Sequence, residues 1–570
     1  MKRRKFLASL GLAGLGNVAA ARSASCQQIG DILKFDAPHL EGTAHRVVWG
    51  RNGAVATADQ HGSLAGLRML MKGGNAIDAI VAAAAALNVV EPYMSGMGGF
   101  GGFMLIYLAA DRKVVALDMM GTSPAAASPG KLTEADCDAG YLAPIVPGAL
   151  QGWAEALSRY GTMSLGEVFE PAIELAERGF VVSKYDALSI AGMATKLARF
   201  PTSARVFLPQ NRPPRMGEII QQKDLARSFR RIALDGPDIF YKGEMAEEII
   251  EFLKPHGGLL SRDDLASYRV QWREPITAAF HGHQLYAMPP GSCGMTMLQA
   301  LNIMEGFNLE KLEPYSPEFA HRWIEAMKLA LTDDDRYNTG RDVEVPVQKL
   351  ISKSYADQQR ARIDPHKVAK FQGPPLSTEG TTSLAAADRW GNAVAFTQSL
   401  VSGFGSGVIA GNTGIFLNNG HRYGFVLDPP GHINILQGGQ RAKGVMAPAM
   451  VLKGGRLLMA VGAAGGYTIP QTVGQVITKV LVYGMDIQQA IASPRMMINR
   501  GGGRVPIRGE AQTYLEHGFP SEVYKQLQAL GHQLTEPGNA GAVQGVYLDP
   551  ETNALAGGAD PRRDGHALSW

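Results

Sequence analysis

The segment Gly380-Thr381-Thr382 holds a residue that could serve as a nucleophile. A threonine hydroxyl inside a chain reacts poorly, but an N-terminal threonine carries an α-amine that can act as base for its own hydroxyl. That amine has a pKa of roughly 7.7–8.0, so much of it is neutral near physiological pH. Cleavage between Gly380 and Thr381 would therefore unite nucleophile and base in one residue. The alternative is an ordinary turn that leads into a strand.

A second hydroxyl is expected close to Thr381. The residues Asp388-Arg389-Trp390-Gly391-Asn392 are typical of a hairpin turn between strands at 383–387 and 393–399. With a three-residue loop, Arg389 pairs with Ala393 and Thr381 lies opposite Val401. Ser399 is then the diagonal neighbour of Thr381 on the same face, within reach of its side chain. A register error of one residue would overturn this geometry.

The second strand of this hairpin has one face of small side chains. That face either leaves room for a substrate beneath Thr381 or packs against another sheet. Its residues are Ala393, Ala395, Thr397 and Ser399.

A glycine-rich turn could supply hydrogen-bond donors. The run Gly462-Ala463-Ala464-Gly465-Gly466 lies between an expected strand at 457–461 and an expected helix at 469–483. Backbone N–H groups exposed at such a turn can stabilise an oxyanion. The alternative is a plain strand-to-helix connection.

Another glycine pattern does not indicate a nucleotide site. Gly96-x-Gly98-x-x-Gly101 has the spacing of a dinucleotide fingerprint, but that motif requires a strand before it and a helix after it. Here the Ala-rich helix at 76–90 precedes the glycines and a strand at 103–108 follows. The order excludes the nucleotide interpretation and favours a close-packed bend.

The elements that must position these residues indicate an α+β protein. A polar loop at 370–379 leads to Gly380, and the stretch from Pro147 to about Lys370 is expected to be mostly helical. Strands before and after that stretch suggest layered packing of helices and sheets. The other expected strands are 47–56, 113–119 and 450–452, and the other expected helices are 65–72, 152–160, 165–178, 319–331 and 523–530.

Composition narrows the function class. The chain has 570 residues, 45% hydrophobic and 19% charged, with a net charge of +3. The basic residues are scattered, so neither nucleic acid nor a membrane surface is an expected partner. Apart from the N-terminal segment, no apolar run is long enough for a transmembrane helix. Three cysteines, Cys26, Cys137 and Cys293, give neither a disulfide framework nor a metal-ligand spacing, and no cofactor is expected.

The N-terminus is typical of an export signal. Lys2-Arg3-Arg4-Lys5 is followed by a short apolar stretch rich in Gly and Ala. The arginine pair with Lys5-Phe6-Leu7 resembles a twin-arginine signal, predicted to span residues 1–25. A periplasmic or secreted protein is therefore expected. Cys26 is a weak candidate for lipid anchoring, because Ser23 stands where a lipobox has leucine.

Many ordered motifs resemble the gamma-glutamyltranspeptidase family of N-terminal-nucleophile hydrolases. The resemblance runs from about Gly53 to Trp570. The matching segments are Gly73-Gly74-Asn75-Ala76-Ile77-Asp78-Ala79, Glu91-Pro92, Ser95-Gly96-Met97-Gly98-Gly99, Met288-Pro289-Pro290, Thr381-Thr382, Asp388, Gly391-Asn392-Ala393-Val394, Gly405-Ser406-Gly407, Gly414-Ile415, Leu417-Asn418-Asn419, Gly465-Gly466 and Asp560-Pro561-Arg562-Arg563-Asp564-Gly565.

The resemblance implies a fold and a catalytic set. The fold would be a four-layer αββα sandwich, made as a precursor that cuts itself at Gly380–Thr381 into a large subunit, 26–380, and a small subunit, 381–570. Thr381 would be the nucleophile with its α-amine as base. Ser399 would hydrogen-bond the nucleophile, and Gly465 and Gly466 would form the oxyanion hole.

The resemblance also exposes departures in the substrate pocket. Met120 stands where the family has an arginine for the glutamyl α-carboxylate, and Tyr423 where it has an acidic residue for the α-amine. Val401 replaces an asparagine, and Gly444-Val445 replaces a pair of serines. Binding a zwitterionic glutamyl head without those groups would leave its charges unpaired. The pattern is closer to the acylase and amidohydrolase branch of the family.

The leading hypothesis is a self-processing threonine amidohydrolase with a weakly charged pocket, acting on a small-molecule amide that is not a γ-glutamyl compound. Water or an amine would accept the acyl group. The alternatives are a γ-glutamyl hydrolase or transferase with a rearranged clamp, and a binding protein that kept the fold without the chemistry. A dimer of the two-subunit unit also stays open.

Overall fold

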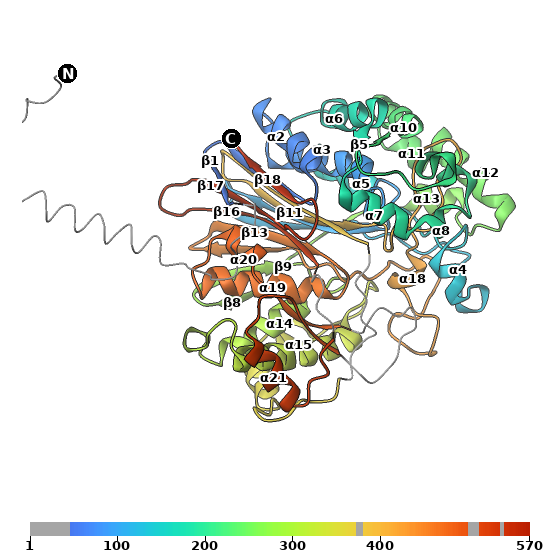
Figure 1. Ribbon diagram of the computed structural model, residues 1–570. Helices are drawn as coiled ribbons and strands as arrows, with labels where there is room; N and C mark the ends of the chain where they lie inside the picture. The colour runs from blue at the N-terminus through green and yellow to red at the C-terminus, as the bar shows by residue number, and fades with distance from the viewer. Residues whose placement is uncertain (1–45, 372–379, 500–511, 536–540) are drawn as a thin grey trace, which may run out of the picture. The chain divides into compact units, whose positions relative to one another are not determined.

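The computed structural model describes residues 46–371, 380–499, 512–535 and 541–570. The predicted signal segment 1–25, Cys26 and most of the predicted loop 370–379 lie outside these ranges. Two seven-stranded antiparallel sheets form the centre of the molecule, stacked face to face (Figure 1).

The first sheet contains the predicted hairpin near its middle. Its strands in spatial order are β18 (His566–Ser569), β2 (Gly53–Thr57), β10 (Thr382–Asp388), β11 (Ala393–Ser399), β3 (Gly101–Leu108), β4 (Lys113–Asp118) and β7 (Gln271–Arg273). The second sheet runs in the order β1 (Val48–Gly50), β17 (Leu555–Ala559), β16 (Ala542–Leu548), β13 (Arg456–Ala464), β12 (Ala449–Lys453), β9 (His283–Ala287) and β8 (Ile276–Phe280).

Helices cover the outer face of each sheet, so the predicted four-layer αββα architecture is confirmed (Figure 1). The first sheet is covered by α2 (Gln60–Met71), α3 (Ala76–Val90), α5 (Ala149–Tyr160), α6 (Leu165–Arg178) and α10 (Lys223–Asp235). The second sheet is covered by α14 (Gly294–Glu305), α15 (Pro317–Tyr337), α19 (Thr468–Leu481) and α20 (Ile487–Ala492).

The helix α3 shows how the sequence sets this packing. Asn75 caps its first turn in a capping box with Asp78, and every residue of α3 is buried. Its run of alanines presents small side chains on all faces, so α2, α6 and the first sheet can approach it closely. The helix ends at Glu91, a buried carboxyl at its C-cap.

One expectation about the fold was wrong. The expected strand 47–56 is split by a turn at 51–52 into β1 and β2, which belong to different sheets. The stretch 147–370 is mostly helical, as predicted, but β7, β8 and β9, which were not predicted, also lie within it and extend both sheets. Their alternating apolar residues were hidden among longer helical patterns.

The remaining elements are short. The helices are α4 (Glu134–Asp138), α7 (Lys184–Gly192), α8 (Ala194–Leu197), α9 (Pro201–Phe207), α11 (Asp238–Tyr241), α12 (Glu244–Leu253), α13 (Arg262–Ser267), α16 (Val347–Leu350), α17 (Lys353–Arg360), α18 (His421–Gly424) and α21 (Ser521–Ala529). The strand pairs are β5 (Phe180–Val181) with β6 (Ile219–Ile220), and β14 (Met496–Asn499) with β15 (Gln512–Leu515).

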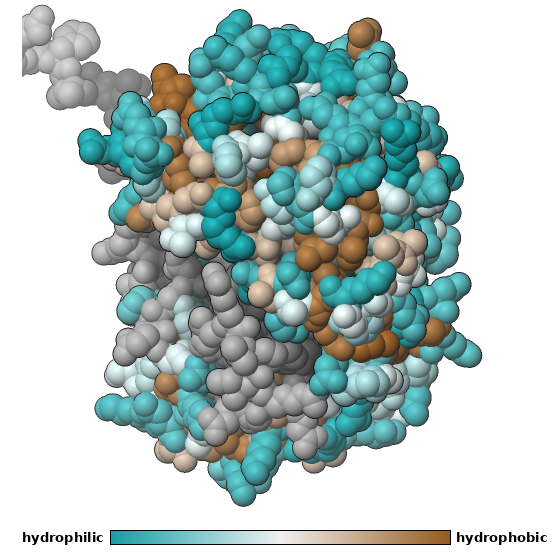
Figure 2. Space-filling view, turned by 90° about the vertical axis from the view of Figure 1, so that its right-hand side faces the viewer, coloured by the Kyte–Doolittle hydropathy of each residue, from teal (hydrophilic) through white to brown (hydrophobic). Residues whose placement is uncertain are grey.

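The surface combines hydrophilic and apolar areas. On the face shown in Figure 2 hydrophilic side chains predominate, and apolar areas lie between them. Such a mixture is normal for a protein surface. Across the described ranges of the chain, no helix has the length and apolar character needed to cross a bilayer.

Candidate active site at the Gly380–Thr381 bond

The hairpin β10–β11 brings Thr381 and Ser399 together. Thr381 lies directly before β10 and Ser399 ends β11, and both side chains are buried. The Thr381 hydroxyl donates to Ser399 Oγ over 3.3 Å, and Ser399 Oγ in turn donates to the carbonyl oxygen of Gly380. The Val401 N–H donates to Ser399 Oγ over 2.8 Å. A hydroxyl chain therefore joins the Thr381 side chain to the carbonyl of the bond before it.

The predicted register of this hairpin was wrong by two residues. Ala387, not Arg389, pairs with Ala393, so Thr382 pairs with Gln398 and Thr381 faces Ser399 directly. The Asp388 carboxylate explains the longer loop, because it accepts hydrogen bonds from the N–H groups of Trp390 and Asn392. A shift of two residues keeps every side chain on its face, so the pairing of the two hydroxyls survives the error.

Most of the small face of β11 packs against the other sheet. Ala393 and Ala395 belong to the core between the two sheets, together with Val461 of β13. At Gly462, an added Cβ would lie 2.5 Å from Ser383 Oγ, so the sheets approach closely there. The packing interpretation therefore holds for Ala393 and Ala395, whereas Ser399, at the end of the face, borders a cavity.

The backbone around the Gly380–Thr381 bond is constrained. Gly380 has φ +26°, and a Cβ there would lie 2.6 Å from the Val401 carbonyl oxygen. Val401 itself has φ +88°, a conformation that is rare and costly for a β-branched residue. The next residues, 402–405, form a turn that Phe404 closes with φ +60°. Strain of this kind clusters at functional sites.

The glycine-rich turn lies between β13 and α19, as predicted. Gly465 has φ +126° and Gly466 has φ +60°, and their carbonyls accept from the N–H groups of Thr468 and Ile469. Among the described residues, neither glycine N–H donates to a protein acceptor. Gly466 also lines the cavity at Thr381, so its N–H group is available to a negatively charged oxygen there.

A cavity opens onto Thr381, Ser399 and Gly466. The structure places four of the predicted pocket residues on its wall: Val401, Tyr423, Gly444 and Val445. The other wall residues are Phe100, Lys443 and Met446, which the sequence interpretation missed.

Met120 lies one layer further in. Its Cε would be 3.3 Å from a Cβ added at Gly444, and its side chain is fully buried. It therefore supports the wall at Gly444 from behind. From the sequence, this apolar core residue could not be distinguished from a residue that lines the cavity.

Lys443 adds a charge that the weakly charged pocket predicted from the sequence did not include. Its Nζ donates to the Tyr467 hydroxyl over 3.1 Å and lies 4.0 Å from an Asp334 carboxylate oxygen. Burial raises the pKa of Tyr467 well above its ordinary value, so the phenol stays neutral. Among the described wall residues, Lys443 is the one that bears a formal charge. Its position directly before Gly444 was a sequence signal that could have revealed it.

Two ionisable side chains, those of Arg563 and Glu91, contact the start of β10. Arg563 Nη1 donates to the Thr381 carbonyl oxygen over 2.8 Å, and the Thr382 hydroxyl donates to Glu91 Oε2 over 2.7 Å. Burial raises the pKa of Glu91 to about 8, although the Arg563 charge and the Thr382 hydrogen bond act in the opposite direction. Glu91 is therefore largely neutral at pH 7.

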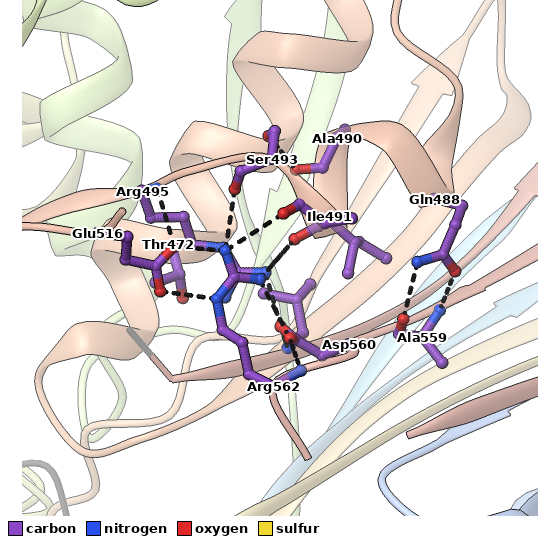
Figure 3. A network of polar contacts seen from close by, with 12 residues as sticks. Thr472, Gln488, Ala490, Ile491, Ser493, Arg495, Glu516, Ala559, Asp560 and Arg562 are labelled. Carbon is purple, nitrogen blue, oxygen red and sulfur yellow. Dashed lines mark hydrogen bonds and ion pairs between the residues drawn. The ribbon is translucent and has the colours of Figure 1, made fainter. Parts of the chain in front are cut away.

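A buried ion network holds the C-terminal segment that carries Arg563 (Figure 3). Asp560 accepts from Arg495 over 2.6 Å and from Arg562 over 3.1 Å, and Glu516 pairs with Arg562. The charges of Arg495 and Arg562 hold the pKa of Asp560 below its ordinary value against its burial. Paired charges of this kind fix the backbone around them.

A second cavity lies on the Gly380 side of the bond. The backbone of Val401 and Ser402 packs against Gly380. The wall of the second cavity is mainly apolar but also carries charged side chains: Lys196 donates to the Gly403 carbonyl over 3.1 Å, and Arg422 pairs with Asp138.

One cluster has the residue types of a metal site. His321, Glu325 and His532 are buried with ligand atoms within 4.8 Å of one another. The two histidines are hydrogen-bonded, with His321 Nδ1 and His532 Nε2 2.8 Å apart, and Glu325 is paired with Lys328. Protein groups thus already engage these atoms.

Comparison with known proteins identifies the family. The sequence pattern of the gamma-glutamyltranspeptidase family matches residues 62–570. The chain belongs to this family. It is 37% identical over 538 residues to an acylase ACY 1 proenzyme of Pseudomonas sp. (strain SE83), covering 90% of this chain and 93% of that protein. It is 34% identical over 554 residues to a glutathione hydrolase proenzyme of Bacillus subtilis (strain 168), covering 91% and 92%.

Solved structures give the same result. The crystal structure of cephalosporin acylase from Bacillus halodurans superposes with a TM-score of 0.84 and 34% identity, covering 93% of this chain and 97% of that one. Membership of the gamma-glutamyltranspeptidase family, with relatives named as acylases and hydrolases, makes this chain an enzyme of the hydrolase and acyltransferase type.

Proposed function

We propose that this enzyme is a threonine amidohydrolase that activates itself by cutting its own Gly380–Thr381 bond. The observation that carries the proposal is the hydroxyl chain from Thr381 through Ser399 to the Gly380 carbonyl. Thr381 Oγ attacks that carbonyl, and the peptide C–N bond breaks as its nitrogen takes a proton. Water then hydrolyses the resulting ester, which frees a Gly380 carboxylate and a Thr381 with a free α-amine.

The matured site acts on an external amide in the same way. The α-amine takes the proton of Thr381 Oγ, which attacks the substrate carbonyl, while the N–H groups of Gly465 and Gly466 stabilise the oxyanion. The amine leaves with a proton, and water releases the acyl group as an acid. An amine in place of that water would give transfer. The cavity beside Gly380, with Lys196, Asp138 and Arg422 on its wall, offers a route for the amine and for water.

The acyl group occupies the cavity at Thr381 and is not a γ-glutamyl group. Val401, Tyr423, Gly444 and Val445 on its wall offer no arginine, carboxylate or serine pair for a glutamyl head. Similarity to a protein named acylase agrees with this. One observation favours a second candidate, a γ-glutamyl hydrolase with a rearranged clamp: Lys443 could pair with a carboxylate, and a glutathione hydrolase is also a relative.

Denaturing gels of the purified protein test the proposal. The wild type should run as two fragments whose N-terminal sequencing shows a new chain start at Thr381, and Thr381→Ala should stay as one chain. The matured enzyme should hydrolyse members of a panel of neutral and acidic N-acyl amides faster than γ-glutamyl-p-nitroanilide. An uncut wild-type chain would refute the proposal, and preferred turnover of the γ-glutamyl compound would establish the second candidate.

The route to the site of action is also proposed. Residues 1–25 direct export by the twin-arginine pathway, because Arg3-Arg4 precedes a short apolar stretch. This gives a periplasmic or secreted two-subunit enzyme. Arg3→Lys with Arg4→Lys should retain the protein in the cytoplasmic fraction, and equal export of this variant would contradict the assignment.

A further inference from the structure

Self-cleavage would create a chain end at the start of β10. The ladder of β10 begins at Thr382, so Thr381 lies one residue before the paired strand. Chain ends fray unless other contacts fix them. A nucleophile that must keep its α-amine beside its own hydroxyl needs such contacts. Besides the Ser399 hydroxyl, two described residues supply them: Arg563, on the Thr381 carbonyl, and Glu91, on the Thr382 hydroxyl.

The position of Glu91 is unfavourable for a charged carboxylate, so the stability of the fold alone does not explain why this residue is there. It is the C-cap of α3, where the helix dipole disfavours a negative charge, and its side chain is 1% exposed. The carboxylates of Asp59 and Asp186 disfavour its ionisation further. In its neutral form it still accepts the Thr382 hydrogen bond, so it holds β10 without cancelling the Arg563 charge.

Arg563 lies next to Thr381 on a segment that ion pairs hold rigidly. Asp560, three residues earlier, lies in the ion network of Figure 3, and the Arg563 guanidinium carbon lies 6.0 Å from the centre of the Tyr185 ring. The α-amine and the carbonyl oxygen of one residue are never more than about 4 Å apart. The Arg563 charge, 2.8 Å from the Thr381 carbonyl oxygen, is therefore close to the amine that cleavage frees.

We propose that Arg563 and Glu91 form a clamp that holds Thr381 in place after self-cleavage, and that the Arg563 charge favours the neutral, basic form of the Thr381 α-amine. A nearby cation disfavours a second positive charge, so more of the amine is available as base at neutral pH. The inference rests on the proposed function and names two positioning residues for it. The other titratable or charged groups around this region are Asp59, Tyr93, Tyr185, Asp186, Tyr423, Lys443 and Asp560.

Four variants separate the clamp from a merely structural role. Arg563→Gln removes the charge and Arg563→Lys keeps it. Glu91→Ala removes the hydrogen bond to Thr382, whereas Glu91→Gln keeps an acceptor and the neutral state. Arg389→Gln, at the exposed far end of the same hairpin, is the control. Thermal melting establishes that each variant folds.

Two measurements are made on the matured proteins. The acidic limb of the pH profile of kcat/KM, measured with one N-acyl anilide, should move up by about one pH unit in Arg563→Gln and stay in place in Arg563→Lys. Trimming of the small subunit by an aminopeptidase should be at least about tenfold faster in Arg563→Gln and Glu91→Ala than in the wild type. Glu91→Gln and Arg389→Gln should behave as the wild type at pH 7.

Each outcome either supports or overturns the clamp. An Arg563→Gln chain that folds but stays uncut, beside a cut Arg563→Lys chain, supports it, because Thr381 must also be held before the cut. If Arg563→Gln does not fold, faster trimming of Glu91→Ala than of Glu91→Gln supports it. Unchanged trimming in Glu91→Ala, or an unchanged acidic limb in a matured Arg563→Gln, overturns the inference. An uncut wild-type chain would instead refute the proposed function.

Discussion

The reacting groups and the wall of the acyl cavity are built differently. Thr381 and Ser399 lie at the ends of two paired strands in the middle of the first sheet, and Gly466 begins the turn into a long helix. The wall residues Val401 and Tyr423 lie instead in a turn and a four-residue helix. Regular elements fix geometry, whereas irregular segments tolerate substitution. The reacting groups are thus held by regular strands and the start of a helix. The residues that select the acyl group lie in the turns and short segments that connect those elements.

The two regions also differ in charge. The reacting region works through hydroxyls and backbone N–H groups, which do not titrate near neutral pH, apart from the α-amine. The wall carries Lys443, and the segments next to it carry ionisable groups such as His421. Changes in the first region should therefore alter rates for all substrates, and changes in the second should alter preference or stability.

Ser399→Ala should have the largest effect. It removes the hydroxyl that joins Thr381 to the Gly380 carbonyl, so self-cleavage should slow by about 10²–10³-fold, the usual cost of losing one donor to a reacting carbonyl. The fraction of cut chain on denaturing gels over time measures this.

Ser383→Ala is the matched control for that change. Its hydroxyl lies in the same hairpin and contacts Thr397 over 3.2 Å, away from the bond. Cleavage of this variant should proceed at the wild-type rate. Equal rates for Ser399→Ala and the wild type would show that the hydroxyl chain is not part of the reaction.

Gly466→Ala should come next. Its φ of +60° strains any other residue, and a methyl group at this turn would disturb the N–H proposed for the oxyanion. The kcat of the matured enzyme should fall about 10²-fold with little change in KM. Gly484→Ala, with φ +64° and open space around the added carbon, carries the same strain elsewhere. A similar loss in both variants would mean that strain, not the oxyanion site, limits the rate.

These two regions were not equally predictable from the sequence. The layered fold followed from periodicity and from the family resemblance, because long helices and alternating strands leave strong patterns. Thr381, Ser399, Gly465 and Gly466 were predicted from residue types that suit the chemistry, together with the family resemblance. The two-residue error in the predicted hairpin register still left Thr381 and Ser399 next to each other.

The wall was predicted only in part. Val401 and Tyr423 were recognised from the family resemblance, but Lys443, which directly precedes the recognised Gly444, was missed. The hydrogen bond from Arg563 to Thr381 joins residues 182 apart in sequence. Contacts of this kind depend on how separate loops meet, which local propensity does not encode.

Lys443→Met should alter selectivity more than rate. With a neutral N-acyl anilide, kcat/KM should change less than about threefold, since the hydroxyls and glycines are untouched. With an acyl chain that ends in a carboxylate, kcat/KM should fall about 10–100-fold, because a hydrogen bond to a charged group contributes roughly 1.5–3 kcal/mol. Kinetics with the two substrates, matched in chain length, measure the difference. An equal loss for both substrates would place Lys443 in the support of the site and not in its selectivity.

His421→Gln should have the smallest effect, on the stability of the wall segment at low pH. Burial lowers the pKa of His421 from 6.5 to about 4, and its Nδ1 lies 2.9 Å from the Leu142 carbonyl oxygen. Because the folded pKa is depressed, the unfolded chain binds the proton first, and stability falls as the pH drops from about 6.5 towards 4. The full loss for one such group is about 3 kcal/mol. Urea midpoints measured from pH 8 to pH 4 should fall less steeply in His421→Gln, and kcat at pH 8 should be unchanged. If the urea midpoint of the variant falls with pH as steeply as that of the wild type, the acid sensitivity comes from other buried groups. His532 is one such group, because burial lowers its pKa to about 3.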